Sequence, residues 1–214
     1  MFYHFTRAEH AISNIKNRRL KIARIMQLND PYDLSPIYVR DPAERKKREQ
    51  WIKQIDQQYG IICFSKNYDS SPMWGHYGEN HSGICLGFDI EPANILEVSY
   101  IKNLIRLPKN VPQTLSTLEK ILKSKHESWC YENEIRILTP LANKAIENGN
   151  HFEPFSYQLR LREVILGHKC NLDIDTIRST CESIFQHRVF VKKTRLAYTA
   201  FKVIEDRAFR ENNS

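Results

Sequence analysis

The irregular order of strand-like and helix-like segments is the feature that most constrains the fold. Short apolar runs typical of buried strands, such as "IICFS" (61–65) and "GICLGFDI" (83–90), stand beside longer segments with helical spacing, such as 41–58 and 173–187. The two kinds do not follow one another as regular strand–helix–strand units. This order disfavours a fully parallel sheet and predicts an α+β protein, with a largely antiparallel, split sheet flanked by helices.

Further segments complete this prediction. Strands are expected at 2–6, 21–28, 61–65, 83–90, 95–101, 129–140, 161–167, 188–196 and 198–205. Helices are expected at 7–20, 41–58, 113–130 and 173–187. Thr6 with Glu9 is a candidate capping box for the first helix, and Asp41 followed by Pro42 is a candidate start of the second. Residues 143–154 are expected to be a polar loop.

Composition sets the class of protein. No internal repeat or linker is visible, so we expect one domain over 1–206 and a polar tail over 207–214. No run approaches the ~18 apolar residues of a membrane span, and the N-terminus does not resemble a signal peptide. A cytoplasmic protein without a membrane partner is therefore expected. Five cysteines without a CxxC pair indicate reduced thiols, and the eight histidines do not fall at metal-ligand spacings with them, so no metal is expected.

The formal net charge of +7 permits an anionic partner such as nucleic acid. The basic strand "HRVFVKKTR" (187–195) is a candidate wall of a binding groove, or else a solvated face.

Two neighbouring carboxylates stand out in "WCYENEIRILTP" (129–140). In an extended chain alternate side chains share a face, so Glu132, Glu134 and Arg136 are expected on one side. Like charges repel, and burial of either is costly unless it is paired. Either this face is a wet edge where Arg136 neutralises a glutamate, or it presents an oriented carboxylate to a sugar hydroxyl or a developing cation.

Two further clusters are candidates for a site. His4, in "YHFT", lies in an aromatic strand and is either structural or catalytic. The segment "SSPMWGHYGENHS" (70–82) is unusually aromatic for a loop. Trp74 and Tyr77 could form a stacking wall for a flat ring, or one helical face that fills the core. The segment "QLNDPYD" (27–33) is most simply a turn.

Several blocks together resemble a bacterial family, the domain of unknown function number 2971. They are "YHFT", "LNDPYD", "ICFSKNYDSSPMWGHYGENHSGICLGFD", "WCYENEIR" and "LREVILG", in this order. The resemblance extends from about Tyr3 to Gly167 and implies no activity.

The layout is also similar to that of ADP-ribosyltransferases of the His-Tyr-Glu class, which include poly-ADP-ribose polymerases and DNA-modifying toxins. His4 and Thr6 match their first strand, and "NIKNRRL" (14–20) matches the following turn, with Arg19 in place of the usual glycine. The positions that match the next strand and the aromatic residue after it are Gly60, Ile61, Phe64, Ser71 and Trp74, with Tyr77 one helical turn on. Glu132 or Glu134 matches the glutamate on the late strand.

This resemblance implies a fold and an activity. NAD would be the substrate, with no metal, and His4, Thr6 and Ser71 would line its site. Trp74 or Tyr77 would stack on nicotinamide, and Arg136 would orient the carboxylate. Glu134, or Glu132, would bind a ribose hydroxyl and stabilise the cationic sugar at the transition state.

A role as a toxin or phage-defence effector follows from the same resemblance. The acceptor would be nucleic acid or protein, and an antitoxin would be a partner. The alternative is a non-enzymatic nucleic-acid or nucleotide-binding module, with the loop at 70–82 stacking bases and the strand at 187–195 holding phosphates.

Overall fold

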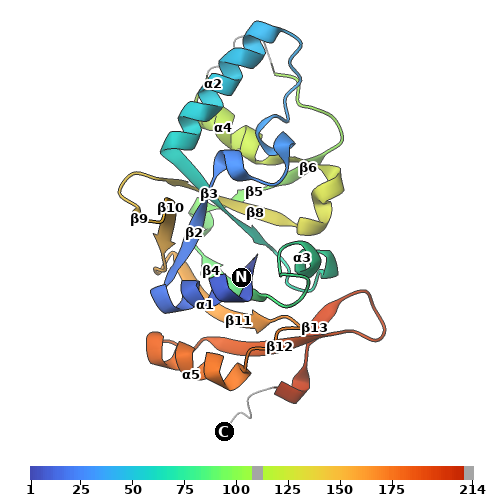
Figure 1. The fold of residues 1–214 in the computed structure, drawn as a ribbon. Coiled ribbons are helices and arrows are strands. Elements are labelled where there is room, and N and C mark those ends of the chain that lie inside the picture. Colours follow the sequence, from blue (N-terminus) through green and yellow to red (C-terminus); the bar gives the residue numbers. More distant parts are fainter. Residues whose placement is uncertain (108–112, 210–214) are drawn as a thin grey trace. The chain divides into compact units, whose positions relative to one another are not determined.

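Helices flank a large sheet of mostly antiparallel strands, which confirms the predicted α+β class (Figure 1). The structure is a computed structural model that describes residues 1–107 and 113–209. The chain divides into two compact units. The first comprises Met1–Leu20, Phe64–Glu91 and Pro154–Ser214, and the second comprises Lys21–Cys63 and Pro92–Glu153.

The first unit holds one part of the sheet, in the strand order β13-β12-β11-β4-β1. Neighbouring strands are antiparallel except β11 and β12, which are parallel and are connected through α5. Helix α5 packs against β12 and α1. The bounds are β1 (Phe2–Thr6), β4 (Ile84–Ile90), β11 (Leu159–Leu166), β12 (Phe190–Leu196), β13 (Val203–Glu205), α1 (Ala8–Asn17), α3 (Ser71–His76), α5 (Ile174–Ile184) and the 3-10 helix η5 (Arg207–Phe209).

The second unit holds most of β2 and β3, in the order β5-β8-β3-β2-β10-β9, and a parallel pair of β6 with β7. Its strands are β2 (Arg19–Arg24), β3 (Tyr59–Ser65), β5 (Leu96–Glu97), β6 (Ser99–Ile101), β7 (Ser124–His126), β8 (Glu134–Pro140), β9 (Ala145–Glu147) and β10 (Asn150–Pro154). Its helices are α2 (Pro42–Gln58) and α4 (Leu115–Leu122), with 3-10 helices η1 (Ile25–Gln27), η2 (Pro31–Leu34), η3 (Pro92–Asn94) and η4 (Glu127–Glu132).

Local sequence signals explain several of these elements. The carboxylate of Asp41 accepts a hydrogen bond from the Ala43 amide at 2.8 Å, and Pro42 begins α2, as predicted. The capping box predicted for α1 is wrong, because Arg7 is the N-cap and no side chain caps it. That helix ends at Asn17, and the φ of 50° of its C-cap places Arg18, and not Arg19, in the left-handed region.

Several segments differ from the prediction. The strand expected over 129–140 begins only at Glu134, and that expected over 198–205 only at Val203. The strand expected over 21–28 ends at Arg24 and is followed by η1. The helix expected over 113–130 ends at Leu122, and β7 and η4 follow it. The expected loop at 143–154 contains the hairpin of β9 and β10. Asn148 and Gly149, with φ values of 49° and 75°, form its turn, as an Asn-Gly pair favours.

Each unit buries its own apolar residues. In the first unit the Trp74 ring lies edge-on to Phe5, at 5.1 Å between ring centroids, and Phe64 packs against Phe88 at 5.8 Å. The core of the second unit joins strands and helices, and its members are Ile25, Ile37, Trp51, Ile52, Ile61, Leu118, Ile121 and Leu122.

Within the described residues, no helix combines the length and the apolar character that a membrane crossing requires. The single domain over 1–206 stays a prediction. Of the predicted tail, Arg207–Phe209 forms η5, and residues 210–214 lie outside the described residues.

The close packing around β3 gives a first prediction. A methyl group on Gly60 would collide with the Ile22 side chain and stand 2.8 Å from the Ala23 carbonyl oxygen. Gly60→Ala should therefore lower the free energy of unfolding by about 1–3 kcal/mol in urea titrations. Gly75→Ala in α3 is the control, because no described atom lies within 4 Å of its added methyl group. Equal effects of the two substitutions would contradict the packing described.

Candidate functional site

Glu134 and Arg136 lie on the same face of β8, as the alternation predicts. The Nε of Arg136 donates to Oε1 of Glu134 at 2.8 Å. Glu132 precedes the strand, at the end of η4. Asn133 lies between the two glutamates and takes the left-handed conformation, with a φ of 45°.

Both glutamates contact a lysine that the sequence did not single out. The Nζ of Lys125 donates to Oε2 of Glu132 at 2.5 Å and to Oε2 of Glu134 at 3.1 Å. It also lies 3.6 Å from Oδ2 of Asp33. The Nη2 of Arg136 donates to Oδ1 of Asp33 at 2.5 Å and to Oε2 of Glu134 at 2.8 Å. We call these five residues the charge cluster.

All five side chains of the charge cluster are buried, with residue exposures of 0–6%. The wet-edge interpretation of the glutamate pair is therefore wrong, although Arg136 does neutralise Glu134. Three acids face two bases, so the fully ionised cluster carries an excess of one negative charge. Burial of such charges is costly, and loss of one partner leaves an uncompensated charge.

The environment shifts the pKa of each acid differently. Burial raises the pKa of Asp33, more than Arg136 and Lys125 lower it. Burial acts in the same direction on Glu134, but the charge and hydrogen bonds of Arg136, helped by Lys125, hold the pKa of Glu134 below its ordinary value. Glu134 is therefore held ionised, and Asp33 is a weaker acid than usual.

The two bases are held charged. Burial alone would lower the pKa of Lys125, but the carboxylates of Glu134, Asp33 and Glu132 outweigh it and raise that pKa. The nearby carboxylates, Glu134 above all, likewise outweigh burial and raise the pKa of Arg136.

A tyrosine and a cysteine surround Glu134. The Tyr100 hydroxyl accepts a hydrogen bond from the Glu134 amide at 2.8 Å, and burial with the nearby carboxylates raises the pKa of Tyr100 to about 12. Burial, and then Glu134, raise the pKa of the Cys63 thiol well above its usual value. Cys63 thus stays protonated and hydrogen-bonded to Glu134, which does not suit a thiolate nucleophile.

The other predicted site residues lie in the first unit. His4 is half-buried in β1, with its ring centroid 5.7 Å from that of Phe64, and Thr6 is half-buried at the end of the same strand. Ser71 begins α3, and Tyr77 follows that helix and is half-buried.

Trp74 is fully buried. Its indole Nε1 donates to the Tyr68 carbonyl oxygen at 2.6 Å. Of the two interpretations of this residue, the structure supports the one in which it fills the core. Tyr77 is more exposed than Trp74 and keeps part of its surface accessible.

Sequence reasoning missed Lys125 and Asp33. Lys125 was placed in a predicted helix and Asp33 in a turn, where charged residues are usually solvated. One signal in the sequence points to such a partner. Arg136 can balance only one charge of the glutamate pair, so a buried pair requires a second cation.

Among the described residues, no group of three or more His, Cys, Asp or Glu side chains is arranged to hold a metal ion. The ammonium and guanidinium groups occupy the positions between the acids. The charge cluster can therefore fix carboxylates in place and stabilise a nearby positive charge.

The fold and the charge cluster define a mixed α+β protein with a buried network of charges in its second unit. The model of the family "Protein of unknown function (DUF2971)" matches residues 73–137, which confirms the predicted resemblance over that stretch. The match includes four members of the charge cluster, and Asp33 lies outside it. No curated protein sequence and no solved structure matches the chain.

The cluster predicts a large effect of removing one cation. Lys125→Met leaves three buried carboxylates against one guanidinium, so the free energy of unfolding should fall by about 3–5 kcal/mol at pH 7. Lys123→Met is the control, since this exposed lysine lies two residues away, outside the cluster. Chemical denaturation monitored by circular dichroism measures both variants.

The penalty of Lys125→Met should shrink on acidification. The pKa of Glu134 lies below its ordinary value of 4.5, so its ion pairs stabilise the folded state above that pH. This stability is lost as the pH falls through the lowered pKa, and protonation also relieves the repulsion in the variant. A difference between wild type and variant that stays constant from pH 7 to pH 3 would contradict this account.

Proposed function

We propose that the chain is an NAD-dependent ADP-ribosyltransferase. The observation that carries this proposal is the buried carboxylate pair, Glu132 and Glu134, held by Lys125 and Arg136. With Asp33, the fully ionised cluster carries one negative charge in excess. Fixed negative charge away from water suits a reaction in which positive charge develops on a sugar. The order of the blocks that resemble this class of enzyme supports the same proposal.

The reaction breaks the bond between C1′ of the ribose and the nicotinamide nitrogen. Nicotinamide leaves with the bonding electron pair, and the sugar becomes an oxocarbenium-like cation. The acceptor then forms a bond to C1′ and loses a proton, for which Glu132 is the proposed base. The positive charge thereby moves from the nicotinamide ring to the sugar. A fixed carboxylate beside the ribose accelerates this reaction because it lies closer to the positive charge in the transition state than in the ground state.

Glu134 is the proposed source of that stabilisation. Its two oxygens already accept three hydrogen bonds from Arg136 and Lys125. A direct hydrogen bond to a ribose hydroxyl would require one of these donors to move. Its charge acts without such a movement, because electrostatic stabilisation needs proximity but no free lone pair.

The resemblance also assigns roles to four residues of the first unit, and these roles stay predictions. His4 is the proposed partner of a ribose hydroxyl, with Thr6 and Ser71 beside NAD. Tyr77 is the proposed stacking residue for nicotinamide, since the buried Trp74 supports the core. Nucleic acid or protein remains the proposed acceptor, in a toxin with its antitoxin or in a phage-defence effector.

Nicotinamide release from labelled NAD, in the presence of cell extract, tests the proposal. Glu134→Gln and Glu132→Gln should each lower the rate by about 10²–10³-fold, as expected for loss of one electrostatic contact to the transition state. Glu127→Gln is the matched control, because the side chain of this residue of η4 is 48% exposed and lies outside the cluster. Melting temperatures of all variants separate lost chemistry from lost folding. Absence of release by the wild-type protein would falsify the proposal, as would full activity of both folded variants.

A second candidate function, nucleic-acid binding, is favoured by the loop between β12 and β13. Tyr198 and Phe201 are 91% and 104% exposed there. The guanidinium of Arg195 lies 5.0 Å from the centroid of the Tyr198 ring. Lys202, whose ammonium donates to Asp69 at 2.7 Å, stands at the other end of the loop. Exposed rings between basic side chains are typical of surfaces that stack single-stranded bases. This loop therefore replaces the buried Trp74 as the proposed stacking element.

Titration with a labelled single-stranded oligonucleotide tests this candidate. Tyr198→Ala and Phe201→Ala should each weaken binding by about 1–3 kcal/mol, and the affinity should fall steeply with salt. Tyr157→Ala is the control, since Tyr157 is 82% exposed at another place in the same unit. An equal loss of affinity in all three variants would contradict a role specific to the loop.

A further inference from the structure

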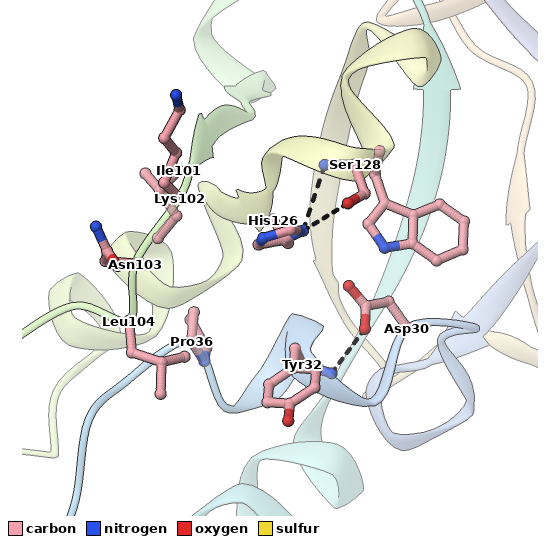
Figure 2. Close-up of a pocket in the computed structure, with 10 residues that line it drawn as sticks. Asp30, Tyr32, Pro36, Ile101, Lys102, Asn103, Leu104, His126 and Ser128 are labelled. Atoms are coloured by element: carbon pink, nitrogen blue, oxygen red, sulfur yellow. Dashed lines mark hydrogen bonds between the residues drawn. The ribbon is translucent and has the colours of Figure 1, made fainter.

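A cavity of about 410 Å³ lies within the second unit, beside the charge cluster (Figure 2). Its volume falls in the range of small-molecule sites. It is lined by residues of η2, β6, β7 and η4 and by neighbouring loop residues. These are Asp30, Tyr32, Pro36, Ile101, Lys102, Asn103, Leu104, His126, Ser128 and Trp129.

Asp30 is the most unusual residue of this cavity. It is 5% exposed, and its Oδ1 caps η2 by accepting a hydrogen bond from the Tyr32 amide at 2.9 Å. Its Oδ2 is buried and has no hydrogen-bond partner among the described residues. Figure 2 shows this second oxygen turned away from Tyr32. A buried acceptor without a donor is costly, so a ligand that supplies N–H donors would remove the penalty.

His126 supplies a donor to the same cavity. Its Nδ1 accepts a hydrogen bond from the Ser128 amide at 3.3 Å and lies 2.8 Å from the Ser128 hydroxyl. In the neutral ring the proton is therefore on Nε2. Figure 2 shows this nitrogen on the side of the ring away from Ser128. The cavity thus combines a ring N–H donor with a carboxylate acceptor.

The remaining walls suit a flat ring. Tyr32 is 59% exposed, so much of its ring is accessible for stacking. Trp129 also lines the cavity, and the Lys125 ammonium lies 4.9 Å from the centroid of its ring, which joins this wall to the charge cluster. Ile101 and Leu104 add aliphatic surface. Stacking on aromatic side chains is a general mode of binding nucleobases.

We propose that this cavity binds a guanine base. Guanine presents two adjacent donors, N1–H and the 2-amino group, which can both point at the second oxygen of Asp30, and its O6 matches the N–H donor of His126. Adenine and cytosine each place a ring-nitrogen acceptor beside their amino group, and uracil places a carbonyl oxygen on either side of N3–H. Each of these bases therefore offers one donor group, flanked by an acceptor, to the second oxygen of Asp30, whereas guanine offers two adjacent donors.

The composition of the cavity favours a neutral ring over a cationic ligand. An ammonium group would be attracted by Asp30 and the aromatic rings, but it would leave the ring N–H of His126 without an acceptor. The proposal does not rest on the transferase activity, because the base of NAD is adenine. Binding of guanine and turnover of NAD can therefore fail separately.

The substitution Asp30→Asn tests the proposal sharply. The side-chain oxygen of asparagine can keep the cap on the Tyr32 amide, and its NH₂ group then replaces the unpartnered oxygen. The donor–acceptor pattern is thereby reversed while shape and volume are kept. Affinity for guanosine monophosphate, measured by isothermal titration calorimetry, should fall at least about tenfold, and the preference over adenosine monophosphate should disappear.

Asp41→Asn is the matched control, since Asp41 caps α2 with the same geometry and does not line the cavity. This variant should bind like the wild type. A second variant, Tyr32→Ala, removes an exposed ring and should also weaken binding without unfolding the protein. An oligothymidylate with one guanine separates a base presented by nucleic acid from the free mononucleotide, and tighter binding of either probe than of its adenine counterpart supports the proposal.

Three results would overturn it. The first is no binding of either guanine probe at millimolar concentration, and the second is equal binding of guanine and adenine probes. The third is that guanosine monophosphate does not bind but tetramethylammonium does, and that Asp30→Asn abolishes the binding of tetramethylammonium. This result would identify a cation site.

Discussion

The second unit depends on the guanidinium of Arg136. It is fully buried, and its nitrogens contact Glu134 on its own strand, Asp33 in η2 and the Leu122 carbonyl oxygen at the end of α4. Three segments distant in the sequence thus meet at one planar cation with fixed donor directions. The contact with Leu122 also satisfies a terminal carbonyl that the helix itself leaves without a donor. Lys125 then balances one of the two remaining negative charges, which lets Glu132 and Glu134 lie close together.

The sequence predicted those parts of the structure that depend on neighbouring residues. The Asp41 cap, the buried strand at 83–90 and the common face of Glu134 and Arg136 all follow from local chemistry or from period-two alternation. The polar composition of 143–154 favours a loop, whereas its Asn148-Gly149 pair favours the turn of a hairpin, and the structure follows the turn. The partners of the glutamates could not be predicted, since Asp33 approaches Arg136 from 103 positions away in the sequence. The end of α4 at Leu122 could not be predicted either, because it depends on Lys125, which enters the interior on β7 instead of staying on a helix surface.

The candidate sites share one physical theme, the placement of polar groups where water is scarce. In the charge cluster every acid has a base within 4 Å, and Arg136 and Lys125 hold Glu134 ionised. In the cavity beside it, Asp30 keeps one oxygen without a donor among the described residues. A carboxylate held ionised by fixed cations suits electrostatic stabilisation of a reacting centre, whereas a buried acceptor at a cavity suits recognition of a ligand. The buried Trp74 supports the first unit, and the exposed rings at Tyr198 and Phe201 are available to a partner.

The mutual dependence of the five buried charges has an evolutionary consequence. A change at one position leaves a partner charged in a dry environment, whereas simultaneous replacement by apolar residues can be neutral or even stabilising. Single steps away from the network therefore cross an unstable intermediate, and selection retains the set as a whole. Related chains should accordingly keep all five ionisable residues together or lose them together. Position 33 should then covary with positions 125, 132, 134 and 136 more strongly than its distance from them along the chain would suggest.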